Sequence, residues 1–304
     1  MTGYLFIALA LVAGCVKGYC GKQTSGTLTR TSDALFANIV RMVFCICIGG
    51  VLLLFQSGTS FATSPLGILS ALIGGLSTAL FTVTWLLSVK RGAYMLVEVF
   101  LLSGVMLPIL LCRVCFGEVI RPLQWVGMAL LILAAFLMCT YNKTIKGAVK
   151  GADLLLLLLC ALANGMVDFS QKLFVESTSD GNVALFSLLT YLFAALGLAL
   201  AYPLFKKREP SPQKADDNSS SPLTILRTIL PYVAVMAVCL FLHSYFKTAA
   251  ANHLDAIIIY PLTQGGSLTL SLLMSATLFR EKINGKCILG VLLSFISLLL
   301  INVL

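Results

Sequence analysis

Charged side chains are scarce in this sequence, and long stretches contain none. Asp, Glu, Lys and Arg make up 11% of the 304 residues, whereas a soluble domain carries roughly 25%. Hydrophobic residues make up 59% of the chain. The composition therefore argues against a soluble domain and favours a chain that lies mostly in lipid.

Histidine is also scarce, since there are two histidines and they form no cluster. The ten cysteines lie mostly within apolar stretches, as Cys45, Cys47 and Cys139 do. We interpret them as small apolar packing residues and expect neither a disulfide framework nor a metal site, and no cofactor. The net charge of +9 is attributed to loops that face anionic lipid and the cytoplasm. Nucleic acid is therefore not an expected partner.

The apolar residues fall into ten runs, each close to the ~20 residues that a helix needs to cross a bilayer. Lipid offers unpaired backbone groups no water, so each run is predicted to be a helix. The expected fold class is an all-α membrane protein with ten transmembrane helices. The first run lacks a basic start and an A-x-A-like site, so we expect it to be retained rather than cleaved. The runs are 2–20, 34–55, 65–88, 93–112, 122–141, 152–170, 183–205, 225–250, 255–279 and 285–303.

One phrase of the sequence occurs twice. Residues 116–127 read FGEVIRPLQWVG and residues 279–290 read FREKINGKCILG. Each has Phe, one residue, Glu, eight residues and Gly, and the two lie 163 positions apart. Glu118 and Glu281 are interpreted as structural residues that pair with basic neighbours, Arg121 for the first and Arg280 and Lys282 for the second.

A second pair of matches lies earlier in each half. Lys22 and Lys172 each precede an Ala-Leu-Phe triplet, and these matches lie 150 positions apart. The larger offset of the later phrase indicates an insertion, which segment 206–222 supplies. That segment is rich in Pro, Ser and charge and is predicted to be a flexible loop.

The two sets of matches predict two copies of one five-helix unit, residues 1–145 and 150–304. A unit with an odd number of spans ends on the side opposite to its start. The second copy is therefore expected to be inverted in the membrane. Inverted repeats around a central site give many carriers two nearly equivalent states, each open to one side.

These features resemble a known family of carriers. Three features resemble the drug/metabolite transporter superfamily, EamA type: five plus five helices, a Glu before the interfacial segment PLQWVG (122–127), and then the apolar terminal helix MALLILAAFLM (128–138). The resemblance implies a carrier of small metabolites in the cell membrane, expected to be a bacterial cytoplasmic membrane. It also implies a central cavity lined by the first, third, fourth, sixth, eighth and ninth spans. A homodimer is compatible with it.

The resemblance also reveals a difference. Four-helix relatives carry a membrane-embedded Glu in the first helix that binds cations and protons. Alignment places Gly14 at that position, and the repeat counterpart of Gly14 is Asn164. Simple exchange of cationic drugs for protons is therefore not favoured.

Polar side chains within the spans are the candidates for a binding site, because such groups usually face a cavity or a partner. Several recur at helical spacing, one or two turns apart. The candidates for substrate binding or coupling are Lys17, Trp85, Tyr94, Glu98, Asn164, Asp168, His243, Lys247, Tyr260 and Gln264.

Some of these residues have a plain structural alternative. Lys17 and Asp168 could form a buried ion pair that joins the first and sixth spans. Lys247 could extend to the interface, and Trp85 could be an interfacial anchor. Glu98 has no obvious local partner, and it could exchange protons if burial favours its neutral form. In the second span, Asn38 and Arg41 are interpreted as anchors of a helix end.

Residues of both charge signs suit a zwitterion. Lys17, His243 and Lys247 could bind a carboxylate or phosphate, while Glu98 and Asp168 could bind an amine or a proton. We therefore expect a secondary transporter for an amino-acid-like or other small polar metabolite. It would work by alternating access in the direction of export, with protons or another ion as the coupling species. Nucleotide-sugar or multidrug carriage is the alternative. An intramembrane enzyme, which we do not expect, would need a catalytic constellation such as His-x-x-x-His, and none is present.

The orientation follows from the distribution of basic residues. Most Lys and Arg outside the spans lie in loops that follow odd-numbered spans. Basic loops face the cytoplasm, so we expect both termini outside. The resemblance implies the opposite, with both termini in the cytoplasm.

Overall fold

The structure is a computed structural model, and it describes residues 2–25, 28, 30–55, 64–91, 94–145, 147–178, 182–208, 222–278 and 284–302. Within these ranges all regular structure is helical, which confirms the all-helical prediction. The helices are α1 (Thr2–Ser25), α2 (Thr31–Phe55), α3 (Pro65–Arg91), α4 (Tyr94–Ser103), α5 (Met106–Phe116), α6 (Pro122–Ile145), α7 (Gly151–Ser177), α8 (Val183–Arg208), α9 (Pro222–Ala251), α10 (Ala256–Thr277) and α11 (Gly285–Asn302).

Most of these helices have the length and composition of membrane spans. In the part of the chain that the structure describes, nine helical segments are long and apolar enough to cross a membrane. Helices α4 and α5 count together as one of them, Tyr94–Phe116, and the shorter apolar helix Gly285–Ile301 lies at the position of the tenth predicted run. The apolar helices are those of a multi-pass membrane protein.

Two sequence predictions meet the edges of the described residues. The segment predicted to be a flexible loop, 206–222, is partly helical, because α8 continues to Arg208 and α9 begins at Pro222. The rest of it lies outside the described residues, as does Glu281. The side chain of Lys22 is likewise not described, although its backbone belongs to α1.

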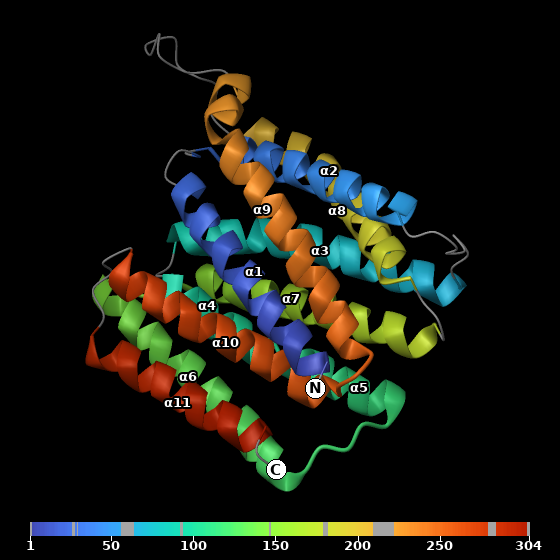
Figure 1. Ribbon diagram of the computed structural model, residues 1–304. Helices are drawn as coiled ribbons and strands as arrows, with labels where there is room; N and C mark the ends of the chain where they lie inside the picture. The colour runs from blue at the N-terminus through green and yellow to red at the C-terminus, as the bar shows by residue number, and fades with distance from the viewer. Residues whose placement is uncertain are drawn as a thin grey trace.

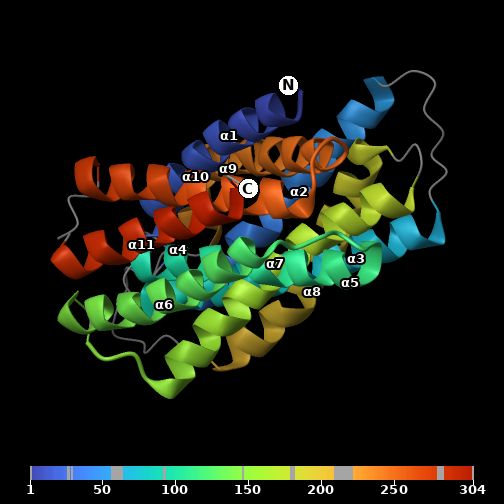
Figure 2. The same ribbon diagram turned by 90° about the horizontal axis from the view of Figure 1, so that it is seen from below.

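The helices form a bundle in which distant parts of the sequence lie side by side (Figure 1). Helix α1 packs along α9, α3 along α7, α2 along α8, and α6 along α11. The α6–α11 pair forms the lower edge of the bundle in Figure 1 and faces the viewer in Figure 2, which is seen from below. The contact of Gly3 with Leu254 places the start of α1 beside the end of α9, at what we call the packed end. The opposite end, where α1 ends, is called the cavity end.

Helices α4 and α5 make a single span that is interrupted at Gly104 and Val105. A Cβ atom on Gly104 would collide with the carbonyl oxygen of Ala161 on α7, and one on Gly165 would lie 2.6 Å from the carbonyl oxygen of Gly104. Small residues of this kind let the backbones of membrane helices approach closely. The interruption therefore holds α4 tightly against α7.

The repeated phrase of the sequence ends, in both copies, at a contact between α6 and α11. A Cβ atom on Gly127 would lie 2.9 Å from the carbonyl oxygen of Ser297, and one on Gly290 would lie 2.8 Å from the sulfur of Met138. The Ser297 hydroxyl donates to the carbonyl oxygen of Gly127. Nearby, the Gln124 side-chain amide donates to the carbonyl oxygen of Ile301 at 3.0 Å. Gly127 is therefore required for this close helix crossing, whereas a side chain at Gly290 would have to displace only the flexible Met138 side chain.

This crossing gives a testable prediction about stability. Gly127→Ala should destabilise the protein by about 1–3 kcal/mol, because the added methyl group meets a rigid backbone oxygen. Gly285→Ala is the matched control, since a Cβ atom at the start of α11 has no heavy atom within 4 Å. Thermal unfolding of the purified variants in detergent checks the difference. Equal melting temperatures for Gly127→Ala and the control would show that the helices do not cross as described.

Candidate functional site

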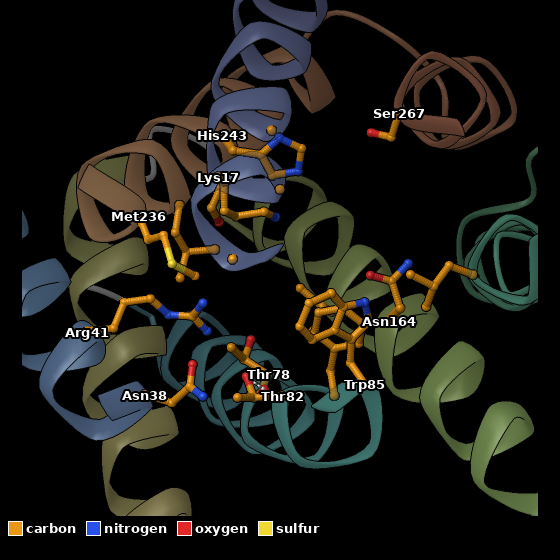
Figure 3. A pocket seen from close by; sticks show the side chains of 18 of the residues that line it. Lys17, Asn38, Arg41, Thr78, Thr82, Trp85, Asn164, Met236, His243 and Ser267 are labelled. Atoms are coloured by element: carbon orange, nitrogen blue, oxygen red, sulfur yellow. Dashed lines mark hydrogen bonds between the residues drawn. The ribbon is translucent and has the colours of Figure 1, made fainter. Parts of the chain in front are cut away.

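A cavity of about 210 Å³ lies within the bundle and is lined by residues of eight helices (Figure 3). The six helices implied by the family resemblance, α1, α3, α4, α7, α9 and α10, all contribute. Helices α2 and α8 contribute as well, which the resemblance did not imply. No lining residue comes from the edge helices α6 and α11 among the residues described.

The cavity extends from the middle of the bundle toward the cavity end. On α1 its lining runs from Gly14 to Thr24, close to the end of that helix. On α9 it runs from Val233 to Lys247, and α9 begins on the same side at Pro222. The lining therefore approaches one end of the bundle and stops short of the other.

Aromatic packing fills the packed end. The ring of Phe6 stacks on that of Phe246, with 6.1 Å between centroids, and on that of His253, with 6.0 Å. A Cβ atom on Gly3 would lie 2.9 Å from the side chain of Leu254. The start of α1 is thus packed tightly against the turn that joins α9 to α10.

A lysine on α7 ties this turn to the rest of the packed end. The Lys172 ammonium donates to the carbonyl oxygens of Ala251 and Leu254, each at 3.4 Å. It also forms ion pairs with Glu176 at 2.8 Å and with Glu118 at 3.7 Å. The lysine is buried, so its charge is neutralised by partners rather than by solvent.

Glu118 has a different partner from the one that the sequence predicted. Its carboxylate pairs with Lys172 rather than with Arg121. It also accepts a hydrogen bond, at 3.3 Å, from the backbone N–H of Ala256, the first residue of α10. Burial raises the pKa of the Glu118 carboxyl, and the Ala256 N–H and the Lys172 charge act in the opposite direction. The interaction also suits the positive end of the α10 dipole.

A buried ion pair lies at the inner wall of the cavity. The Lys247 ammonium on α9 is 2.5 Å from the Asp168 carboxylate on α7, and both side chains are at most 4% exposed. The alternative in which Asp168 pairs with Lys17 is therefore wrong, as is the alternative in which Lys247 extends to the interface. The predicted site residue Tyr260 is also not part of the lining. It lies behind the pair, with its ring 5.5 Å from Lys247 and its hydroxyl donating to the Asp168 carbonyl oxygen at 2.6 Å.

Glu98 lies on α4 and lines the cavity. The sequence suggested no local partner, but the hydroxyls of Tyr94 and Ser271 lie within hydrogen-bonding reach of its carboxylate. These two hydroxyl oxygens are 3.4 Å apart and join α4 to α10. The carboxylate is therefore held in position by neutral groups. Lys17, the nearest cation that interacts with it electrostatically, makes no ion pair among the described residues.

Arg41 is a site residue that sequence reasoning missed. Together with Asn38 it was interpreted as an anchor of a helix end, but both line the cavity (Figure 3). The buried Nε of Arg41 has no hydrogen-bond partner in the described structure. Helix α2 begins at Thr31, so Arg41 lies ten residues along it, about 15 Å from the start. That depth was the available signal, because an anchor would lie in the first turn.

His243 connects α9 to α1 beside the position that differs from the family pattern. Its Nδ1 donates a hydrogen bond to the carbonyl oxygen of Ala10 at 2.8 Å. A Cβ atom on Gly14 would lie 3.1 Å from His243 Nδ1. Gly14 therefore makes room for the imidazole, and a Glu in its place would compete with the histidine for that space.

The remaining predicted residues Trp85, Asn164 and Gln264 also line the cavity. Several buried polar atoms in the lining have no hydrogen-bond partner within the described protein, namely Asn164 Nδ2, Gln171 Oε1 and Thr190 Oγ1. Buried polar groups are normally satisfied by protein, water or ligand. The cavity is thus prepared for a polar occupant.

The cysteines contribute one side chain to the cavity, that of Cys15. All ten cysteines are free. A Cys-x-x-Cys spacing occurs in α5, where Cys112 is buried and Cys115 is exposed. Among the residues described, no group of three or more His, Cys, Asp or Glu could hold a metal ion.

The buried ion pair gives a second prediction. Asp168→Asn or Lys247→Gln alone should destabilise the protein by about 3–5 kcal/mol, because each leaves an uncompensated buried charge. The double variant should recover most of the loss, since neither charge remains. Arg91→Gln is the control, because the Arg91–Asp153 pair at 3.3 Å is exposed and is expected to contribute about 0–1 kcal/mol. Thermal unfolding measures all four variants. If the double variant loses as much stability as the two single variants together, the two residues are not coupled.

Comparison with known proteins identifies a shared fold and nothing more specific. No family model matches the sequence, and no curated protein matches it. Chains of solved structures do match, 28 in number. One of them has a TM-score of 0.65 and 14% sequence identity, and the match covers 98% of this chain and 95% of that chain; it is titled only "Crystal structure of protein". The arrangement of helices is therefore shared with a solved structure over almost its whole length.

Proposed function

We propose that the protein is a secondary transporter that moves a small polar metabolite across a membrane by alternating access. The observation that carries the proposal is a cavity with charges of both signs, enclosed by apolar spanning helices and extending toward one end of the bundle. Ionisable groups within a membrane usually mark a substrate or ion path. The aromatic and ionic contacts at the packed end would have to separate in the second state.

The pattern of helix contacts supports two inverted five-helix units, 1–145 and 150–304. If each helix is replaced by its counterpart in the other unit, α1 becomes α7 and α9 becomes α3. The α1–α9 contact then corresponds to the α3–α7 contact, and both pairs pack closely. The same exchange maps the α6–α11 and α2–α8 contacts onto themselves. Such a relationship would let the two units exchange conformations, so that the cavity opens to one side and then to the other.

The glycine contacts support the same correspondence in finer detail. Gly127 faces Ser297 and Ile301 on α11, while Gly290 faces Met138 and, farther away, Ala134 on α6. Residues 127 and 290, 134 and 297, and 138 and 301 are each separated by the offset of the repeated phrase. The glycine of the first phrase therefore contacts α11 at the positions equivalent to those at which the glycine of the second phrase contacts α6.

The cavity favours a small charged substrate. Its volume of about 210 Å³ is below the ~300–1,000 Å³ of pockets that hold drug-sized ligands. Lys17 and Arg41 offer positive charge, and Glu98 offers a carboxylate held by two hydroxyls. An amino-acid-like metabolite suits this set better than a nucleotide sugar or a large apolar drug.

A third prediction tests the role of Glu98. Glu98→Gln should abolish proton-coupled uptake in proteoliposomes while the protein remains folded, because glutamine keeps the size and hydrogen-bonding capacity of the side chain but cannot exchange a proton. Uptake of radiolabelled amino acids and organic acids is measured with an imposed pH gradient, and the accumulated solute is checked for chemical change. Asp153→Asn is the control, since Asp153 is a partly exposed carboxylate outside the cavity. Unaltered pH-dependent uptake by Glu98→Gln would contradict the assignment, and a chemically altered solute would indicate an enzyme.

A further inference from the structure

The charges in the cavity do not cancel. Five charged side chains line it: Lys17, Arg41, Glu98, Asp168 and Lys247. Asp168 and Lys247 neutralise each other at 2.5 Å. Two cations, Lys17 and Arg41, then face one carboxylate, Glu98, and the formal balance is one excess positive charge. Within a membrane such an excess is costly unless a counter-charge arrives.

The protein groups around Arg41 are neutral and cannot balance its charge. The Thr78 and Thr82 hydroxyls donate to carbonyl oxygens of their own helix, at 2.7 and 2.8 Å. The Tyr191 hydroxyl donates to the carbonyl oxygen of Leu240 at 3.1 Å, and the Cys45 thiol donates to that of Ala237 at 3.4 Å. No described carboxylate pairs with Arg41.

The two cations line one cavity. Lys17 on α1 and Arg41 on α2 repel each other electrostatically, and both point into the same part of the cavity (Figure 3). An anion between them would relieve that repulsion. A guanidinium has a planar fork of donors that matches a carboxylate or a phosphate in two parallel hydrogen bonds. Glu98 on α4 lines the same cavity and interacts electrostatically with Lys17, so it can meet a cationic group of the same ligand.

We propose that Arg41 and Lys17 bind the anionic group of the substrate, and that the substrate carries one net negative charge. This inference rests on the proposed transport function and specifies its substrate class. A ligand with two anionic groups and one ammonium group would bring the cavity to neutrality, with one anion at Arg41 and Lys17 and the ammonium at Glu98. The second anionic group can be a carboxylate or a phosphate in its singly charged form, because either gives a net charge of −1.

Tryptophan fluorescence provides a direct test of binding, because the chain has two tryptophans. Trp85 lines the cavity, and Trp125 lies exposed on α6 outside it. In a Trp125→Phe background the emission of Trp85 therefore reports occupancy of the cavity. The probes are two matched pairs that differ by an anionic group, L-aspartate with L-asparagine and L-phosphoserine with L-serine.

Acidic probes should bind about 10- to 100-fold more tightly than their neutral partners, the ratio expected for a charge-assisted contact. Arg41→Gln should remove most of that preference, and Arg41→Lys should keep the preference with weaker binding. Arg113→Gln, an exposed arginine outside the cavity, should change neither. A response confined to aspartate or to phosphoserine identifies the second anionic group as a carboxylate or a phosphate.

Several results would overturn the proposal: no response to either acidic probe, equal affinity within each pair, or a preference that persists in Arg41→Gln. If Arg41→Gln does not fold, equal affinities of Arg41→Lys and the parent for the acidic probes would also overturn it. The test is separate from that of transport. Charge-selective binding without uptake in proteoliposomes would contradict the transport function alone, and uptake without charge-selective binding would contradict this inference alone.

Discussion

The ion pair between Asp168 and Lys247 is the interaction on which the arrangement of the cavity depends. It joins α7 to α9 through two buried side chains, and the Tyr260 hydroxyl on α10 donates to the Asp168 backbone beside it. Helix α9 is tied in turn to α1 through His243 and Ala10. Because the pair neutralises itself, the remaining charges of the cavity, Lys17, Arg41 and Glu98, face the interior without a protein counter-ion in bonding contact.

The two ends of the bundle are built differently around this pair. At the packed end, Lys172 binds the turn between α9 and α10 and pairs with Glu118, while the ring of Phe6 packs over the same turn. At the cavity end the lining continues past Thr24 to Leu28. A small number of polar and aromatic contacts therefore separates the cavity from one side of the bundle, and the proposed transport cycle would require these contacts to break.

The helices could be predicted from the sequence, but most partners in the site could not. Apolar runs of bilayer length located the nine long apolar segments of the described residues and the shorter helix α11, because lipid imposes helices. Polar stripes placed Glu98, Asn164 and Gln264 correctly on the lining. The same reasoning misplaced Tyr260, since a stripe gives the face of a helix and not the neighbour that it meets.

Pairing between distant residues, and the depth of residues within a span, caused the other errors. Asp168 and Lys247 are 79 positions apart, and nothing local in the sequence distinguishes Lys247 from Lys17 as the partner. Arg41 was assigned to a helix end although the predicted run 34–55 already placed it about two turns inside the span. The actual start at Thr31 puts Arg41 well inside the helix.

Alternating access itself is tested most directly by labelling one cysteine in the cavity from each side of the membrane. Ser267 lines the cavity (Figure 3), so a Ser267→Cys variant without the ten native cysteines carries its only thiol there. The account predicts that an impermeant maleimide labels this cysteine from either side in oriented vesicles, because the cavity opens to the two sides in turn. Labelling from one side under every condition, with and without transported solute, would contradict the account and identify the cavity as a closed-ended binding pocket.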